Sequence, residues 1–267
     1  MNAYVYGIVR WPLPAPVPAG AKDGPKSKGK AKRAGAAAAL DVKGVGDPPA
    51  DVRAVRHRDL AALVSDVTAV DLEAQGVRGL RRDMRAHAAV LNHLAGFATV
   101  LPFQFGVVLP SEAAVVGRLL EPRCRALVEH LKRLEGAVEV SLKATYVEDR
   151  VLSEVVTENP QLGARGGSGR SYQAKMELGR RIAAAIQAKQ ARDARSLLDV
   201  LRPLVRDVRV SEPASDLMVL NASLLVGRDG LSSFDRTLAQ LDAEEGHRIK
   251  LDCVGPLPPY SFANLSL

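Results

Sequence analysis

Alternation of apolar and polar residues predicts strands in both halves of the chain. Residues 4–9 are rich in strand-forming side chains, and residues 138–146 alternate between apolar and polar positions over nearly the whole segment. A hairpin turn at Arg58-Asp59 suits the two short segments on either side of it. Residues 99–108 also favour a strand, and Pro102 places its start at an edge or a bulge. The predicted strands are 4–9, 52–57, 60–67, 99–108, 138–146, 208–210, 217–226 and 249–253.

Apolar residues spaced three or four apart predict the helices between these strands. Ser111 with Glu112 suits a helix start, Pro122 is expected to kink that helix, and Gly136 ends it. The other predicted helices cover residues 78–97, 172–205 and 234–245. In the first, the stripe expected to be buried is Val77, Leu80, Met84, Ala88, Leu91 and Ala95. In the helix over 172–205, the residues expected to share one face are Tyr172, Met176, Gly179, Ile182 and Ile186.

The order of elements indicates an α+β protein with two domains. Residues 136–254 give strand, helix, strand, strand, helix, strand, which is the βαββαβ order of a ferredoxin-like fold. Such a fold has a four-stranded antiparallel sheet with both helices on one face. We place an N-terminal α+β domain at residues 1–135, the ferredoxin-like domain at 136–254 and an extended Pro-rich tail at 255–267.

Most of the positive charge comes from one segment. Residues 22–33 contain six lysines and arginines and one aspartate, which gives +5 of the chain's net +7. The surrounding residues 12–49 are rich in Pro, Gly and Lys and are expected to form a disordered insertion. A lysine tract can bind phosphate backbones, but no aromatic residue interleaves the lysines. A solubilising insertion is therefore the favoured interpretation, and no specific nucleic acid is expected as a partner.

Composition points to a reducing compartment. The chain has only two cysteines, Cys124 and Cys253, and no disulfide framework can be built from them. No apolar run approaches the roughly 20 residues of a membrane span, and the N-terminus lacks a signal-peptide pattern. We expect a cytoplasmic protein without a membrane span.

The sequence contains no recognisable catalytic or metal-binding constellation. Its five histidines include no pair four residues apart that could bind zinc from one helix face; His87 and His93 are predicted to be partly exposed helix residues. Both cysteines are interpreted as small buried hydrophobic residues. The acid pairs Glu148-Asp149 and Glu244-Glu245 are expected to be solvated. The glycine cluster at 163–170 has the wrong spacing for a phosphate-binding loop and predicts a linker. We therefore expect no enzyme activity, no cofactor and no metal.

Several segments together resemble the gas vesicle protein F/L family. They are residues 4–9, the Leu-Pro-Phe-Gln-Phe-Gly strand within 100–108, the Ser111-Glu112 helix start, residues 134–140, residues 169–172 and the tail Gly-Pro-Leu-Pro-Pro-Tyr-Ser-Phe at 255–262. The tail is the most specific of these. Two features depart from the family pattern: Leu257 stands where a tryptophan is common, and the basic insertion has no counterpart.

The resemblance implies a two-domain α+β fold with a modified ferredoxin-like C-terminal half. It also implies a non-enzymatic minor component of gas vesicles, cytoplasmic and associated with the vesicle. Its implied role is to bind the hydrophobic major shell protein and prevent its aggregation during vesicle nucleation. Other minor gas vesicle proteins are further implied partners.

Two other function classes stay open on the residues alone. A ferredoxin-like module for nucleic acids or small ligands would carry aromatic residues on a central strand, and residues 217–226 contain none. A small acyl- or phosphoryl-transfer enzyme would need an anion cradle, which we cannot locate. An apolar client would be bound through an exposed apolar patch or a free strand edge.

The tail is expected to be a stiff extended arm. Its three prolines remove backbone donors, so we predict neither helix nor central strand there. Its large side chains either dock on a domain or stay free to engage the shell protein. The candidate partner-binding or tail-docking residues are Phe103, Phe105, Leu257, Tyr260 and Phe262.

Overall fold

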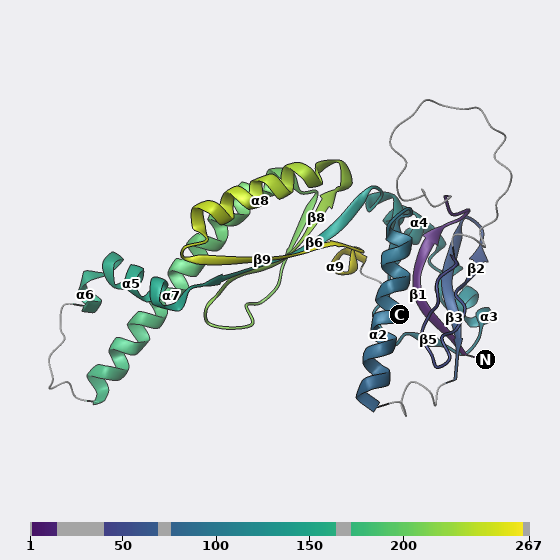
Figure 1. The fold of residues 1–267 in the computed structure, drawn as a ribbon, viewed down its shortest axis with the longest axis horizontal. Coiled ribbons are helices and arrows are strands. Elements are labelled where there is room, and N and C mark those ends of the chain that lie inside the picture. The colour runs from purple at the N-terminus through teal and green to yellow at the C-terminus, as the bar shows by residue number, and fades with distance from the viewer. Residues whose placement is uncertain (1, 15–39, 69–75, 164–171, 264–267) are drawn as a thin grey trace. The chain divides into compact units, whose positions relative to one another are not determined.

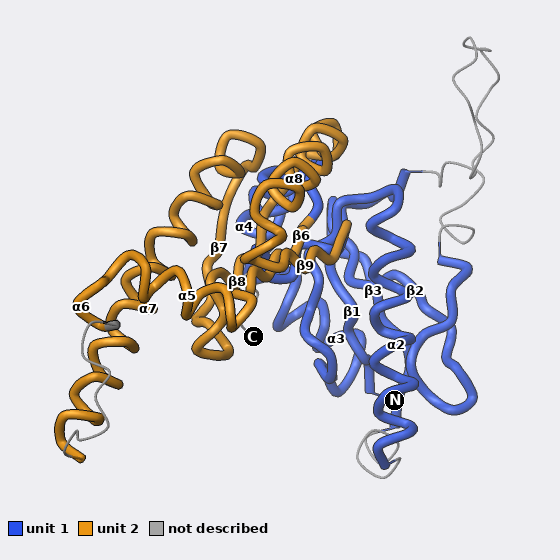
Figure 2. Tube along the Cα trace, turned by 60° about the vertical axis from the view of Figure 1, so that its left-hand side comes forward, with its two compact units in different colours: residues 1–138, 257–267 blue, residues 139–256 orange. Residues whose placement is uncertain are grey.

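The computed structural model describes residues 2–14, 40–68, 76–163 and 172–263 (Figure 1). The chain forms two compact units: unit 1 contains residues 1–138 and 257–267, and unit 2 contains residues 139–256 (Figure 2). The basic window 22–33 and nearly all of the glycine cluster at 163–170 lie outside the described residues. Residues 40–49 of the predicted disordered insertion are described, and Val45 is buried in the core of unit 1, so this part of that prediction is wrong. The units divide the chain at 138 and 256, whereas the sequence placed divisions at 135 and 254. That each unit is an independently folding domain stays a prediction.

Unit 1 is built on a five-stranded sheet in which β1 is the central strand. The strand order is β2-β3-β1-β4, and β5 also pairs with β1. Seven of the nine residues of β1 are buried, because β3 pairs with one of its edges and β4 and β5 share the other. The strands are β1 (Asn2–Arg10), β2 (Arg53–His57), β3 (Leu60–Val67), β4 (Val100–Pro102) and β5 (Val108–Leu109).

The predicted single strand over 99–108 is wrong, because the structure has two short strands there. Gly106 lies between them with φ +96°, a left-handed conformation that suits glycine. A backbone hydrogen bond keeps the segment between the two strands beside β1: Val5 N donates to the Val107 carbonyl oxygen at 2.9 Å. The other three predicted strands of this half, at 4–9, 52–57 and 60–67, and the edge position of Pro102 are confirmed.

The helices of unit 1 follow most of the predicted boundaries. They are α2 (Gly76–Ala95), α3 (Glu112–Ala114), the π-helical turn Val115–Leu120, α4 (Cys124–Arg133) and α9 (Tyr260–Ala263). Ser111 caps α3, with its Oγ accepting a hydrogen bond from Ala114 N at 3.2 Å. The helix breaks around Pro122, as expected from its missing backbone donor.

The buried face of α2 differs from the predicted stripe. Val77, Leu80 and Met84 are 66%, 41% and 50% exposed. The face toward the sheet instead contains Asp83 and His87, which are both buried. The apolar-periodicity rule missed this face because polar side chains occupy two of its central positions.

Unit 2 is a mixed helix and strand unit with a four-stranded sheet in the order β7-β8-β6-β9. Tyr146 N donates to the Leu217 carbonyl oxygen and Val147 N to the Arg248 carbonyl oxygen, so the end of β6 meets the starts of both neighbouring strands. β6 therefore runs antiparallel to β8 and β9, and β7 pairs antiparallel with β8. The strands are β6 (Ala137–Tyr146), β7 (Asp207–Val210), β8 (Met218–Gly227) and β9 (Ile249–Leu257).

The helices of unit 2 include two that the sequence did not predict. They are α5 (Glu148–Glu158), α6 (Pro160–Gly163), α7 (Tyr172–Leu201) and α8 (Leu231–Glu245), with single 3₁₀ turns at Arg202–Leu204 and Arg228–Gly230. The unpredicted helices are α5 and the short α6, which stands at the start of the segment predicted to be a linker. Both pack against α7. Leu197 and Leu201 of α7 and Phe234 of α8 are buried in the same core as the strands. No described helix is long and apolar enough to cross a membrane.

The tail is only partly the extended arm that was predicted. Residues 255–257 continue β9, which is an edge strand, and residues 260–263 form the one-turn helix α9. The expectation of no helix is wrong because Pro258 and Pro259 both precede α9, where a missing donor is tolerated. Phe262 N donates to the Pro259 carbonyl oxygen at 3.1 Å and closes the turn.

Candidate functional site

The tail lies against the body of unit 1. Phe262 is 1% exposed, and its carbonyl oxygen accepts a hydrogen bond from His130 Nε2 at 2.9 Å. Pro258 and Pro259 are buried, and Tyr260 packs, half-buried, against the core that contains Tyr4 and Tyr6. The tail is therefore fastened to the same unit as the N-terminal sheet.

The five candidate residues all belong to unit 1 but differ in burial. Phe103 and Phe262 are buried, whereas Phe105, Leu257 and Tyr260 are half-buried. These positions support the docking interpretation of the tail over a free arm. The role of the five residues stays a proposal, which the double substitution described below tests.

A hydrogen-bonded aromatic cluster connects β1 to α2. The Tyr4 hydroxyl lies 2.9 Å from His87 Nδ1, and His87 Nε2 lies 3.1 Å from the Phe103 carbonyl oxygen. Because a carbonyl only accepts, Nε2 carries the proton and Nδ1 accepts from Tyr4. The Tyr4 hydroxyl in turn accepts from Gly106 N at 3.1 Å. Every polar atom of the His87 ring is therefore paired in its neutral form.

Burial lowers the pKa of His87 below 6.5 and outweighs the opposing hydrogen bond to Phe103. The prediction that His87 is partly exposed is wrong, while His93 is exposed as expected. Tyr6 lies beside this pair: its hydroxyl accepts from Val45 N at 2.8 Å and bonds Ser65 Oγ at 2.7 Å. The cluster has the character of a paired core and not of a reactive site.

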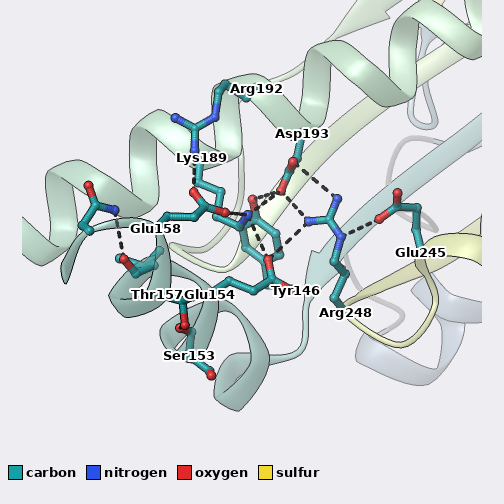
Figure 3. A network of polar contacts seen from close by, with 12 residues as sticks. Tyr146, Ser153, Glu154, Thr157, Glu158, Lys189, Arg192, Asp193, Glu245 and Arg248 are labelled. Carbon is teal, nitrogen blue, oxygen red and sulfur yellow. Dashed lines mark hydrogen bonds and ion pairs between the residues drawn. The ribbon is translucent and has the colours of Figure 1, made fainter. Parts of the chain in front are cut away.

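An ion network joins α5, α7 and the end of the sheet in unit 2 (Figure 3). Lys189 of α7 is at its centre, with 7% of its side chain exposed. Its Nζ lies 2.6 Å from a Glu158 oxygen, 2.9 Å from a Glu154 oxygen and 3.9 Å from Asp193 Oδ2. The two glutamates come from α5, so this lysine holds α5 against α7.

Asp193 connects the same network to the strands. Its Oδ2 accepts hydrogen bonds from the Tyr146 hydroxyl at 2.6 Å and from Arg248 Nη1 at 2.7 Å. Tyr146 ends β6, and Arg248 precedes β9 (Figure 3). Arg248 Nε also donates to Glu245 at 2.5 Å. Glu245 is therefore part of an ion pair, which corrects the prediction that it is solvated.

The electrostatics of the network favour the charged forms of Asp193, Lys189 and Arg248. Burial raises the pKa of Asp193, but hydrogen bonds from Arg248 and Tyr146 outweigh it and hold that pKa below its ordinary value. Burial lowers the pKa of Lys189, but the bonds to Glu158 and Glu154 reverse this and raise it. Burial and the bond to Asp193 raise the pKa of Tyr146, which stays protonated. The arrangement suits a structural clamp, since its charged side chains form ion pairs with one another.

Sequence reasoning missed this network, although α7 contains a signal for it. Ile182, Ile186, Lys189, Asp193 and Leu197 follow one another at helical spacing, so a lysine and an aspartate interrupt an otherwise apolar stripe. A buried stripe can tolerate such residues only if they are paired. Among the described residues, no group of three His, Cys, Asp or Glu side chains is arranged to hold a metal ion.

An open groove of about 450 Å³ lies between α8 and β9 in unit 2. Its apolar floor includes Leu231, Leu238 and Leu251, and Cys253 lies on the β9 side. The predicted burial of Cys253 is wrong: the residue is exposed, and Cys124 is half-buried. The partial desolvation of its sulfur and the nearby charge of Asp235 raise the pKa of the Cys253 thiol. The thiol is therefore protonated at neutral pH.

Comparison with known proteins identifies the family. The profile of the family "Gas vesicle synthesis protein GvpL/GvpF" matches residues 2–264. The chain belongs to the GvpL/GvpF family. This confirms the resemblance seen in the sequence segments, and the family is one of gas vesicle proteins and not a known enzyme family.

Relatives of known name support this membership. The chain is 35% identical to gas vesicle protein F of a Streptomyces species, over 98% of this chain and 99% of the relative. It is 27% identical to gas vesicle protein F of Haloferax mediterranei, over 85% of this chain and 88% of the relative. The crystal structure of GvpF from Microcystis aeruginosa has a TM-score of 0.72 at 25% identity, covering 99% of both chains. That of GvpF from Anabaena sp. PCC7120 shares the fold, with a TM-score of 0.79 and 24% identity over 100% of this chain and 99% of the other.

In this GvpL/GvpF protein, replacing Lys189 with Met is predicted to destabilise unit 2 by about 3 kcal/mol, because it removes the buried cation that the Glu154 and Glu158 carboxylates share. Urea unfolding followed by circular dichroism measures the loss. Lys175→Met is the matched control: Lys175 is exposed on the same helix, and its loss is expected to change stability by less than about 0.5 kcal/mol. Equal midpoints for the two variants would contradict the clamp.

The tail prediction concerns Tyr260 and Phe262. Their joint replacement by Ala is expected to cost unit 1 about 2–5 kcal/mol, because it leaves a cavity where Phe262 is buried. Trp11 is the chain's only tryptophan and belongs to unit 1, so its fluorescence reports unfolding of that unit. Tyr172→Ala removes a 78% exposed aromatic side chain and is the control. An unchanged fluorescence midpoint in the double variant would show that the tail does not fasten unit 1.

Proposed function

We propose that this protein is an assembly factor that binds the hydrophobic major shell protein of gas vesicles and prevents its aggregation during vesicle nucleation. Membership of the GvpL/GvpF family over nearly the whole chain is the observation that carries the proposal. We further propose that it acts without catalysis, in the cytoplasm and on the vesicle, and that other minor gas vesicle proteins are additional partners.

Exposed apolar side chains on packed helices of unit 2 support this proposal. Leu152 and Val156 on α5 are 40% and 43% exposed, and Met176 on α7 is 47% exposed beside the even more exposed Tyr172. Tyr172 and Met176 are four residues apart and therefore lie on one face of α7. A flexible methionine next to an aromatic ring suits adaptable contact with an apolar client. We propose these four residues as the client surface.

The proposal includes a finer description of unit 2. Its element order and the strand order β9-β6-β8-β7 are those of a ferredoxin-like fold, with α5 and α6 as additions before the first long helix. We propose this assignment, in which α7 and α8 are the two helices of the motif. The long N-terminal part of α7 then extends beyond the helix length needed to cover the sheet, which leaves its apolar face available to a client.

The test is dilution of purified, denatured major shell protein into buffer with and without this protein, followed by light scattering. The wild-type protein is expected to lower the scattering several-fold at equimolar concentration. The double variant Tyr172→Ser with Met176→Ser is expected to restore most of the light scattering. Its thermal midpoint is expected to stay within a few degrees of the wild type, because both side chains are exposed. Lys175→Ser, on the same turns of α7, is the control and is expected to behave as wild type.

The outcomes separate the surface from the function. Undiminished scattering with the wild-type protein would contradict the proposed function itself. Suppression that survives in the double variant would reject only this client surface.

A further inference from the structure

Two surfaces of the chain carry opposite charges in matching helical patterns. The first is the basic face of α2, made of Val77, Leu80 and Met84 with Arg78 and Arg85 beside them. All five residues are exposed, and neither arginine has an ion-pair partner among the described residues. The apolar positions follow i, i+3, i+7 and form one row, and the arginines, seven residues apart, form a second row that flanks the first about 100° around the helix.

The second surface is the acidic groove between α8 and β9. Leu231 and Leu238 of α8 lie on its floor, and Asp235 and Asp242 line it from the same helix. Both aspartates are exposed, and neither takes part in an ion pair within the described parts of the chain. The α8 residues follow i, i+4, i+7, i+11, which places the apolar and charged residues on one side of a helix.

The spacing of the charges is the same on the two helices. Arg78 and Arg85 are seven residues apart, as are Asp235 and Asp242. At 1.5 Å per residue, each pair spans about 10.5 Å along its helix axis. Long arginine side chains can reach carboxylates at the rim of a groove while their helix packs its apolar row on the floor.

We propose that the basic face of α2 of one molecule docks into the acidic groove of a second copy of this chain. Val77, Leu80 and Met84 cover the apolar floor, and Arg78 and Arg85 pair with Asp235 and Asp242. Opposite charge on two surfaces of equal spacing favours a second copy over a neutral apolar partner, which would leave both aspartates unpaired. This inference does not depend on the proposed binding of the shell protein.

The proposed contact joins two different surfaces, so in a pair of molecules the first keeps its groove free and the second keeps its basic face free. Such head-to-tail contacts close into rings or continue as filaments. The protein is therefore expected to form a concentration-dependent series of oligomers. Because the charges are at the surface, the series is expected to shorten as salt is added.

Sedimentation velocity over a concentration series at low ionic strength tests the contact. The wild-type chain is expected to associate. Arg78→Glu with Arg85→Glu, and separately Asp235→Lys with Asp242→Lys, are each expected to stay monomeric, because each puts like charges opposite one another. An equimolar mixture of these two variants is expected to associate again, since each supplies the partner that the other lacks.

The control variant, Arg181→Glu with Arg195→Glu, reverses the charge at two exposed positions of α7. It is expected to associate as the wild type does. Circular dichroism verifies that every variant is folded. A monomeric wild-type protein at all concentrations would overturn the inference and leave the groove to another occupant. Association that persists in both reversed variants, or a mixture that stays monomeric, would also overturn it.

A cross-link locates the contact independently. In a Cys124→Ser background, Met84→Cys is expected to form an intermolecular disulfide with the exposed Cys253 of the groove. Further replacement of Cys253 by Ser is expected to abolish the linked species. Equal cross-linking with and without Cys253 would place the contact elsewhere.

Discussion

Pairing of buried polar side chains between a strand and a long helix is the interaction on which both units depend. In unit 1, Tyr4 of β1 donates to His87 of α2, which donates onward to the Phe103 carbonyl oxygen. In unit 2, Tyr146 of β6 donates to Asp193 of α7, which also binds Arg248 before β9. An unpaired polar group at these depths would cost about 1–3 kcal/mol or more. Each network therefore fixes which face of its helix meets the sheet.

This constraint explains why apolar residues remain on the surface. In α2 the buried face includes Asp83 and His87, so Val77, Leu80 and Met84 point away from the core. In α5, Glu154 and Glu158 pair with Lys189 while Leu152 and Val156 stay exposed. The proposed binding of an apolar partner would use such residues outside the core. The polar pairs keep the helices in place while these residues stay available.

Much of the fold follows from local sequence patterns, and the failures in the helix faces come from buried polar residues. Strand alternation located β1, β3, β6 and β8, and the Ser111 cap and Pro122 break were found from single residues with strong backbone preferences. The buried stripe of α2, the helix α5 and the ion network were missed. In α2 and in the ion network the buried positions carry Asp83, His87 or Lys189, and only tertiary partners make such residues acceptable in a core. The buried residues of α5, Val151 and Val155, are apolar, so its omission has a different cause. Of the candidate tail residues, the sequence found the large apolar side chains but could not tell which surface covers them.

The pH dependence of unfolding tests the central role of the buried pairs most directly. The pKa of His87 is lowered in the folded state, so its contribution to stability is present above about pH 6.5 and is lost as the pH falls. Trp11 fluorescence in urea at pH 7.5 and 5.5 measures this for unit 1. The wild-type protein is expected to lose up to about 1.4 kcal/mol of stability between these two values. His87→Gln, which cannot take up a proton, is expected to lose much less over the same interval. Equal losses in the two proteins would contradict the account.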